Sequence, residues 1–454
     1  MKKSRFLLIF LMVTALIFSA CSGGSNEGTT SGGSEPEKKE EVVLKVAFFQ
    51  GGFGDAWFKY LKEEFEKNHE GVTVKLEGDP NLNDTIDPKV EGGVDTPDVF
   101  FVNGRSWSKW GPQDLVMELS DLYDSKVPGT DLTLNEYIQD AVKDRLFYDP
   151  DKSGVRKYAV PWSAGSMSIV YNNKMFKEHG WTYPKTWGEF EKLCEEIKAE
   201  GIAPLTYPGQ YINYVRSAYR GWQLQSLGED KFKEYKDPSS SDIYGDEALK
   251  IPWQKWETLF KNGWIMEGTT ALNHTQSQME FINNNAAMIF NGFWLENEMK
   301  EAWAEDYDIR MAPIPADGKL GKSTMLLYMP DYGAITSKTK HPEIAKEFLL
   351  FSLSPEASRK FTELSGGLRA LKYDMKDIET TEFTKSCMEI MADPDVYTYT
   401  DASSHPVLGK LYKEFSKPYL EEIATGKMNS EKAFGAFKEN AEKKYEKIKK
   451  DLGN

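Results

Sequence analysis

Apolar runs of strand length alternate with helically spaced apolar residues where the chain's body begins, and this order constrains the fold more than any other feature. Residues 41–49 form an apolar run of strand length, and residues 57–69 carry apolar side chains at helical spacing. Two more runs of strand length follow at 72–76 and 98–102. Strand, helix and strand in alternation predict an α/β fold with a parallel sheet covered by helices.

The same kind of pattern continues along the chain. Thr186 followed by Glu189 is a capping-box pattern, and it predicts a helix with Cys194 on its apolar face. Ser354 followed by Pro355 predicts another helix start. Further elements are expected as two short strands within 158–172 with a break at 161–165, a strand at 286–290, a helix after Pro342 and a surface helix over 430–450.

The length of the body favours two domains, because residues 42–454 exceed what one hydrophobic core usually supports. Twelve Trp, 22 Tyr and 25 Phe supply ample apolar mass without disulfides. Cys194 and Cys387 lie far apart in the sequence, which favours two buried thiols; a disulfide between them is the alternative in an oxidising compartment.

The N-terminus is typical of a targeting signal. Lys2, Lys3 and Arg5 precede an uncharged apolar run over 6–20, which is shorter than the roughly 20 residues that a spanning helix needs. Small residues then precede Cys21, as in the cleavage site of bacterial lipoproteins. That resemblance implies a lipoprotein signal peptide at 1–20 and lipidation of Cys21; an ordinary signal peptide with an incidental cysteine is the alternative.

Residues 22–41 lack apolar side chains that could join a core, so 21–41 is expected to be a lipid anchor followed by a flexible tether. The formal net charge of −15 falls to −18 once the three cationic residues of the signal are removed. Such a surface argues against nucleic acid and against adsorption to anionic lipid.

An ordered series of motifs resembles the extracellular solute-binding proteins of carbohydrate ABC importers, the maltose-binding-protein-like group. Each motif is weak alone, but together they span nearly the whole mature chain. They are the first strand at 42–50, Thr96-Pro97-Asp98-Val99-Phe100, the crossover segment 158–172, Pro184-Lys185-Thr186-Trp187, the stretch 287–294 that ends in Gly292-Phe293-Trp294, Ser354-Pro355-Glu356-Ala357, and the loop 366–370 with Arg369 where proline is commoner.

The resemblance implies a two-lobe, periplasmic-binding-protein-like fold with a hinge and a ligand cleft between the lobes. The N-terminal lobe would comprise 42–160 plus 328–370, and the C-terminal lobe 161–327 plus 371–454. It also implies a monomeric receptor, held on the extracytoplasmic face of the cell membrane by its lipid. The receptor would bind a mono- or oligosaccharide, close about its hinge, and deliver the ligand to ABC permease subunits that work with a partner ATPase.

A sugar needs flat aromatic platforms for its C–H faces and polar side chains for its hydroxyls. In open α/β sheets ligands bind beyond the carboxyl ends of the strands. Trp294 is the principal candidate, because the aromatic at this position commonly stacks on sugar in the resembling family. The other candidates are Gln50, Gly52, Phe53, Asn103, Gly104, Arg105, Trp107, Trp162, Ser163, Tyr211, Phe293, Glu296, Tyr332, Gly367, Arg369 and Tyr399.

Not every aromatic is a candidate, since most Trp and Tyr side chains are packing residues. Trp187, Trp253 and Trp256 fall inside predicted helices and are assigned to the core. Asn172 and Asn173 are expected to brace the hinge. The run 291–298, followed by 311–313, resembles a subgroup associated with N-acetylglucosamine or chitobiose; plant- or starch-derived oligosaccharides are the alternative.

Other chemistries lack a motif. The five histidines have no zinc-site spacing, the segment from Asp149 misses the acidic end of a calcium loop, and Ala164-Gly165-Ser166-Met167 is not a nucleophile elbow. We therefore expect no metal, no cofactor and no catalysis. Two alternatives remain open: a secreted lipoprotein glycoside hydrolase that uses a carboxylate pair, and an adhesive lipoprotein without a ligand.

Overall fold

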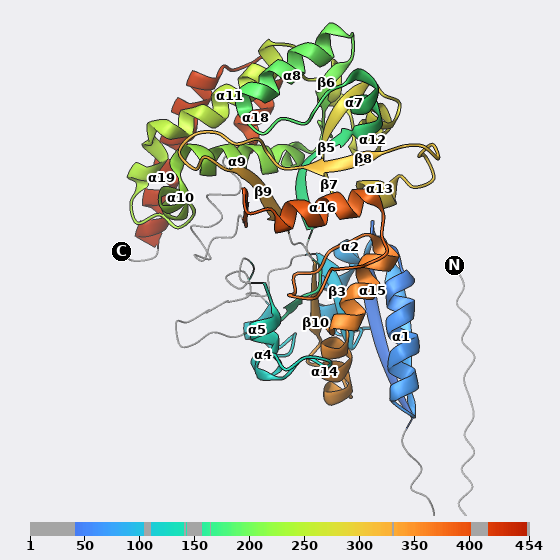
Figure 1. Ribbon diagram of the computed structural model, residues 1–454. Coiled ribbons are helices and arrows are strands. Elements are labelled where there is room, and N and C mark those ends of the chain that lie inside the picture. Colours follow the sequence, from blue (N-terminus) through green and yellow to red (C-terminus); the bar gives the residue numbers. More distant parts are fainter. Residues whose placement is uncertain are drawn as a thin grey trace, which may run out of the picture. The chain divides into compact units, whose positions relative to one another are not determined.

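Two β-sheets organise the chain in the computed structural model, which describes residues 41–103, 110–139, 142, 157–163, 165–328, 331–400 and 416–451 (Figure 1). The first sheet has the order β2-β1-β3-β10-β4. Its strands are β2 (Val72–Asp79), β1 (Val42–Phe49), β3 (Val99–Asn103), β10 (Asp331–Ile335) and β4 (Val160–Pro161). The predicted parallel pairing is confirmed for β1 with β2 and β3. β10 is antiparallel to β3 and β4, so the sheet is mixed.

The second sheet is mostly antiparallel, which the strand-and-helix alternation did not predict. Its order is β11-β9-β5-β7-β6, with β8 paired to β5. β5 runs antiparallel to β7, β8 and β9. The strands are β5 (Gly165–Asn172), β6 (Ala203–Thr206), β7 (Ala286–Gly292), β8 (Ile309–Ala312), β9 (Ser323–Tyr328) and β11 (Val396–Tyr399).

The elements that pack on the first sheet are called the first lobe here, and those on the second sheet the second lobe. α1 is helical where predicted and buries Trp57, Phe58, Leu61 and Phe65. It lies beside α15, which begins as predicted at Ser354, whose side chain caps the helix (Figure 1). The helices of the first lobe are α1 (Ala56–Asn68), α2 (Leu82–Gly92), η1 (Gly111–Gln113), α4 (Ser120–Asp124), α5 (Leu134–Tyr137), α14 (Pro342–Phe351) and α15 (Pro355–Ser365).

In the described ranges, most of the helices belong to the second lobe. The capping box of Thr186 and Glu189 is confirmed at the start of α8, and Cys194 is buried on that helix. The helices are α7 (Asn173–His179), α8 (Trp187–Ala199), η2 (Ile212–Val215), α9 (Arg216–Leu227), α10 (Glu229–Lys236), η3 (Ser241–Gly245), η4 (Glu247–Leu249), α11 (Lys250–Lys261), η5 (Thr269–Ala271), α12 (His274–Ile282), α13 (Leu295–Glu298), α16 (Glu382–Ala392), α18 (Lys417–Ala424) and α19 (Ser430–Asp451).

Among the described residues, buried side chains form one large cluster in the first lobe and two in the second. Cys194 and Cys387 are buried free thiols in different clusters, as the sequence favoured. Leu371, Tyr373 and Ile378 pack in the first-lobe cluster, beyond the boundary at residue 370 that the sequence predicted. Of the helices in the described ranges, none combines the length and the apolar character needed to cross a bilayer.

The chain passes between the sheets where strands of different sheets follow one another closely. β4 ends at Pro161 and β5 begins at Gly165; β9 ends at Tyr328 and β10 begins at Asp331. These two short passages lie close together, because Trp162 N donates to Asp331 O at 3.3 Å. The predicted strand break near residues 161–165 is therefore a passage from one sheet to the other.

Candidate functional site

The turn after β1 brings first-lobe backbone against the second lobe. Gly54 N donates to Gly51 O at 2.9 Å and closes the turn. Gly52 lies within this turn and faces α13. A Cβ built on Gly52 would lie 2.8 Å from Cβ of Trp294. The Asn297 amide donates a hydrogen bond to the Gly52 carbonyl oxygen. Glycine at position 52 thus allows an approach that a side chain would obstruct.

Trp294 lies just beyond the carboxyl end of β7, where its place after an apolar strand predicted it. A Cβ built on Gly292 would lie 2.3 Å from Cη2 of the indole, so the ring rests against glycine backbone. The ring also meets Tyr214 edge to face, with centroids 6.1 Å apart and an interplanar angle of 83°. Trp294 is partly exposed. Two perpendicular rings form a corner that suits a ligand with weakly apolar faces.

Three polar side chains meet beside this aromatic corner. Nε2 of His274 lies 2.6 Å from Oε2 of Glu298, and Gln278 Nε2 donates to the same oxygen at 2.9 Å. The imidazole also contacts the Tyr214 ring, with centroids 5.3 Å apart. The other oxygen of Glu298, Oε1, lies 3.3 Å from a Cβ built on Gly52 and so faces the first lobe. The Glu298 carboxylate, held in place by His274 and Gln278, is therefore a hydrogen-bond acceptor beside the two rings.

Tyr214, His274, Gln278 and Glu298 were not among the predicted site residues. The sequence carried a signal for two of them, since Tyr214 and Glu298 stand in the loop and the run that were singled out around Tyr211 and Trp294. His274 was considered only as a metal ligand. No periodicity joins positions 214, 274 and 298; packing of η2, α12 and α13 brings them together.

Glu296 lies beside Trp294 in sequence, but its carboxylate is engaged elsewhere. Thr381, which caps α16, donates from Oγ1 to Glu296 Oε2 at 2.6 Å. Burial raises the pKa of the Glu296 carboxyl. Thr384 on α16 donates from Oγ1 to the carbonyl of Gly366 at 3.1 Å. The hydrogen bond from Thr381 to the Glu296 carboxylate therefore joins α13 to the start of α16.

Ser163 and Asp331 join the two passages between the sheets. Ser163 Oγ donates to Asp331 Oδ2 at 2.6 Å, and both residues are buried. Burial raises the pKa of Asp331 to about 7, although the Ser163 hydrogen bond opposes that shift. Ser163 was predicted as a site residue and Asp331 was missed, because its partner lies 168 positions away.

Several of the predicted ligand residues are buried in the structure. Phe293 is 4% exposed and packs in a hydrophobic cluster of the second lobe. Arg369 is fully buried, with its guanidinium 4.7 Å from the Trp57 ring centroid and 5.2 Å from that of Phe361. Tyr399 is buried and donates from its hydroxyl to Ser217 O at 3.1 Å.

Trp162 and its neighbours belong to the first-lobe core. The Trp162 ring stacks on Trp57, with centroids 5.4 Å apart and an angle of 8°. Phe53, partly buried, meets Trp162 edge to face at 6.1 Å. Tyr332 is buried on β10, and a Cβ built on Gly367 would lie 2.7 Å from the Phe53 ring. Trp162 and Tyr332 are buried members of this core, whereas Phe53 is partly exposed at its edge.

The remaining predicted residues divide into exposed ones and ones outside the described ranges. Tyr211 is 51% exposed, and Gln50 is exposed at the end of β1. The backbone of Asn103 pairs with that of Asp331 in the first sheet. Cys21 and the loop residues Gly104, Arg105 and Trp107 lie outside the part of the chain that the structure describes.

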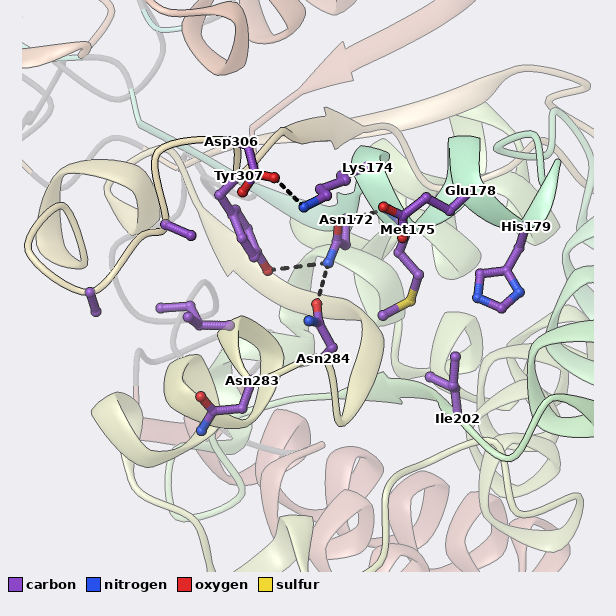
Figure 2. A pocket seen from close by; sticks show the side chains of 13 residues that line it. Asn172, Lys174, Met175, Glu178, His179, Ile202, Asn283, Asn284, Asp306 and Tyr307 are labelled. Atoms are coloured by element: carbon purple, nitrogen blue, oxygen red, sulfur yellow. Dashed lines mark hydrogen bonds and ion pairs between the residues drawn. The ribbon is translucent and has the colours of Figure 1, made fainter.

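A cavity of about 520 Å³ lies at the far end of the second sheet (Figure 2). Asn172, the last residue of β5, lines it, and β5 pairs antiparallel with β7, so the cavity lies where β7 begins and Trp294 where β7 ends. Two pairs of its polar groups interact: Asn172 Nδ2 donates to Asn284 Oδ1 at 2.7 Å, and Lys174 pairs with Asp306 at 2.5 Å. Asn172 thus braces the second lobe, not the hinge as predicted.

A family model described as bacterial extracellular solute-binding protein matches residues 52–359. The multiple sugar-binding protein of Streptococcus mutans is 26% identical over 335 residues, which cover 70% of this chain and 73% of that protein. The diacetylchitobiose binding protein NgcE of Streptomyces coelicolor is 24% identical over 332 residues, which cover 70% of this chain and 68% of that protein.

Solved structures are similar over a larger share of the chain. The solute-binding protein RafE in complex with raffinose has a TM-score of 0.65 at 20% identity, and the match covers 88% of this chain and 100% of that one. A probable secreted solute-binding lipoprotein from Streptomyces coelicolor has a TM-score of 0.68 at 16% identity, covering 89% and 99%. At these identities the likeness establishes the fold, and the predicted two-lobe α/β architecture is confirmed.

Proposed function

Because this chain belongs to the bacterial extracellular solute-binding proteins, we propose that it is a receptor that binds a sugar and delivers it to an ABC importer. The proposal takes its ligand class from relatives whose names specify sugars, including the multiple sugar-binding protein and a maltotriose-binding protein of Pyrococcus abyssi. The permease subunits and their ATPase would be its membrane partners, and no nucleotide would bind this chain.

The observation that carries the proposal is the corner formed by Trp294 and Tyr214 beside the Glu298 carboxylate. Sugar recognition needs an aromatic face and fixed polar acceptors together, and this corner supplies both. The turn at Gly52 lies against it, so a ligand held there would contact both lobes. Glu298 Oε1 is placed to accept a hydrogen bond from a sugar hydroxyl.

Capture would proceed by hinge closure where the chain passes from β4 to β5 and from β9 to β10. A sugar that contacts both lobes binds the closed conformation more tightly than the open one and so favours closure. A hinge motion converts one conformation into the other. The lobes would be divided near 160, 328 and 370, with the last boundary moved toward residue 378 by the packing of Ile378. Small-angle scattering with and without a saturating sugar should give different profiles; superimposable profiles would contradict closure.

The placement of the receptor in the cell is part of the proposal. Lipidation of Cys21 would hold a monomer at the extracytoplasmic face of the cell membrane, and residues 22–41 would give it reach. Extracellular solute-binding proteins act outside the cytoplasm, which agrees with an N-terminal signal at 1–20.

The ligand class is tested by a thermal-shift screen followed by calorimetric titration. The panel should include raffinose, diacetylchitobiose and maltotriose, since similar proteins are named for these sugars or were solved with them. At least one sugar should raise the melting temperature and bind with one-to-one stoichiometry. If no mono- or oligosaccharide in a broad panel binds, while amino acids or peptides do, the sugar assignment is wrong.

The glycoside hydrolase alternative has no support among the similar proteins, which are named as binding proteins. A receptor returns its oligosaccharide intact after long incubation. Release of shorter sugars in proportion to the amount of chain added would restore the alternative.

A further inference from the structure

Asn297 joins the two lobes through the backbone of Gly52. The side chain of Asn297, on α13 of the second lobe, donates to the carbonyl oxygen of Gly52 in the turn after β1. β1 is an inner strand of the first sheet. The hydrogen bond therefore crosses directly from one lobe to the other.

The approach at Gly52 is close because glycine has no side chain. The three atoms nearest to a Cβ built on Gly52 are Trp294 Cβ at 2.8 Å and Cγ and Oε1 of Glu298 at 3.3 Å. None of them belongs to the indole. The contact thus involves the bases of these side chains and not the Trp294 ring.

We propose that the Asn297–Gly52 hydrogen bond is a latch that holds the lobes together beside the ligand site without contacting the ligand. Asn297 would be a positioning residue for capture. A ligand that needs the joined lobes binds in proportion to the fraction of molecules that adopt them. The latch raises this fraction before the ligand arrives. The inference rests on the proposed function, since it assumes a receptor that closes.

Two variants remove the latch in different ways. Asn297→Ala deletes the donor. Gly52→Ala keeps the donor but sets a methyl group against Trp294 Cβ, which is a conflict only when the lobes are joined. Gly52 is outside the left-handed region, so alanine can adopt its backbone conformation.

Matched controls remove the same groups elsewhere. Asn283→Ala deletes an exposed amide at the far end of the second sheet. Gly188→Ala adds a methyl group at a position with no atom within 4 Å of the built Cβ.

Small-angle scattering of the chain in sugar-free buffer tests the latch directly. The Asn297→Ala and Gly52→Ala variants should have a larger radius of gyration than the wild-type chain and the two controls. With a sugar that binds, calorimetry should give an affinity about three- to tenfold weaker for Asn297→Ala, the worth of one net hydrogen bond. Circular-dichroism melts should show all variants folded.

The sugar-free scattering separates this inference from the proposed function. If Asn297→Ala and Gly52→Ala superimpose on the wild-type profile, the latch is overturned, whatever sugar binds. If those variants expand but no sugar binds any variant, the latch stands and the sugar-receptor assignment fails.

Discussion

The rings of Trp294 and Tyr214 meet at 83° with their centroids 6.1 Å apart, although 79 residues lie between them in the sequence.

 The indole follows the end of β7 and the phenol ring comes from η2, so two separate elements build one corner. The Trp294 ring is only partly buried and rests on the backbone of Gly292. A ring held in this way can present a face to a ligand without being needed for the core.

Replacing Trp294 by alanine should therefore weaken sugar binding and leave the fold intact. We expect a loss of about 1–3 kcal/mol in binding, or roughly ten- to hundredfold in affinity. Calorimetric titration and a melt of the ligand-free variant measure the two effects. Trp256→Ala is the matched control: that indole is fully buried and donates to Leu420 O at 3.0 Å. It should instead lose about 3–5 kcal/mol of stability.

The Glu298 carboxylate should contribute to affinity more than to stability. Glu298→Ala removes the acceptor shared by His274 and Gln278, and with it the acceptor offered to a hydroxyl. We expect affinity to fall about tenfold or more, the worth of a hydrogen bond to a charged group. The control is Glu280→Ala on the same helix as His274; Glu280 is bonded to Asn285 at 2.6 Å. Equal affinities for the two variants would remove Glu298 from the site.

The stability of the chain should depend on pH through Asp331. Its pKa is raised to about 7 in the folded chain, against about 3.9 in an unfolded one, so the folded state binds the proton more tightly. Stability contributed by this group is therefore full below about pH 4 and declines as the pH rises to about 7, by up to about 4 kcal/mol. Asp331→Asn should lack this decline. Urea unfolding of both chains from pH 4 to 8 measures it, and parallel curves would contradict the prediction.

Arg369 should prove to be a structural residue. Burial lowers the pKa of its guanidinium to about 9, and the group packs between the rings of Trp57 and Phe361. Arg369→Ala should cost about 2–4 kcal/mol by leaving a cavity, and Arg369→Met should cost less because it fills the space without a buried charge. Both variants should bind sugar as the wild type does when titrated well below their melting temperatures. A large loss of affinity in a folded Arg369→Met variant would return Arg369 to the site.

Cys21 should decide whether the chain stays with the membrane. Cys21→Ala should abolish incorporation of labelled palmitate and move the chain from the detergent phase to the aqueous phase on partitioning. Cys194→Ala is the control, since that thiol is buried and free. Detergent partitioning that is unchanged in Cys21→Ala would show that another feature holds the chain at the membrane.

Local patterns in the sequence were sufficient wherever the structure depends on short-range contacts. The capping box of Thr186 and Glu189 needs residues only three positions apart, and it forms as predicted. The first strand, the helix start at Ser354 and the place of Trp294 after an apolar strand follow from the same short-range rules. The two-lobe fold was predicted from the family resemblance of the ordered motifs, and the similar solved structures confirm it.

Only the tertiary structure decided which side chains share a site. Phe293 and Trp294 are neighbours in sequence, yet one packs in the core and the other is partly exposed beside Tyr214. His274 meets Glu298, and Ser163 meets Asp331, across intervals that no periodicity relates. The physical reason is that spacing along the chain fixes which face of an element is apolar, whereas the packing of elements fixes which polar groups can reach one another.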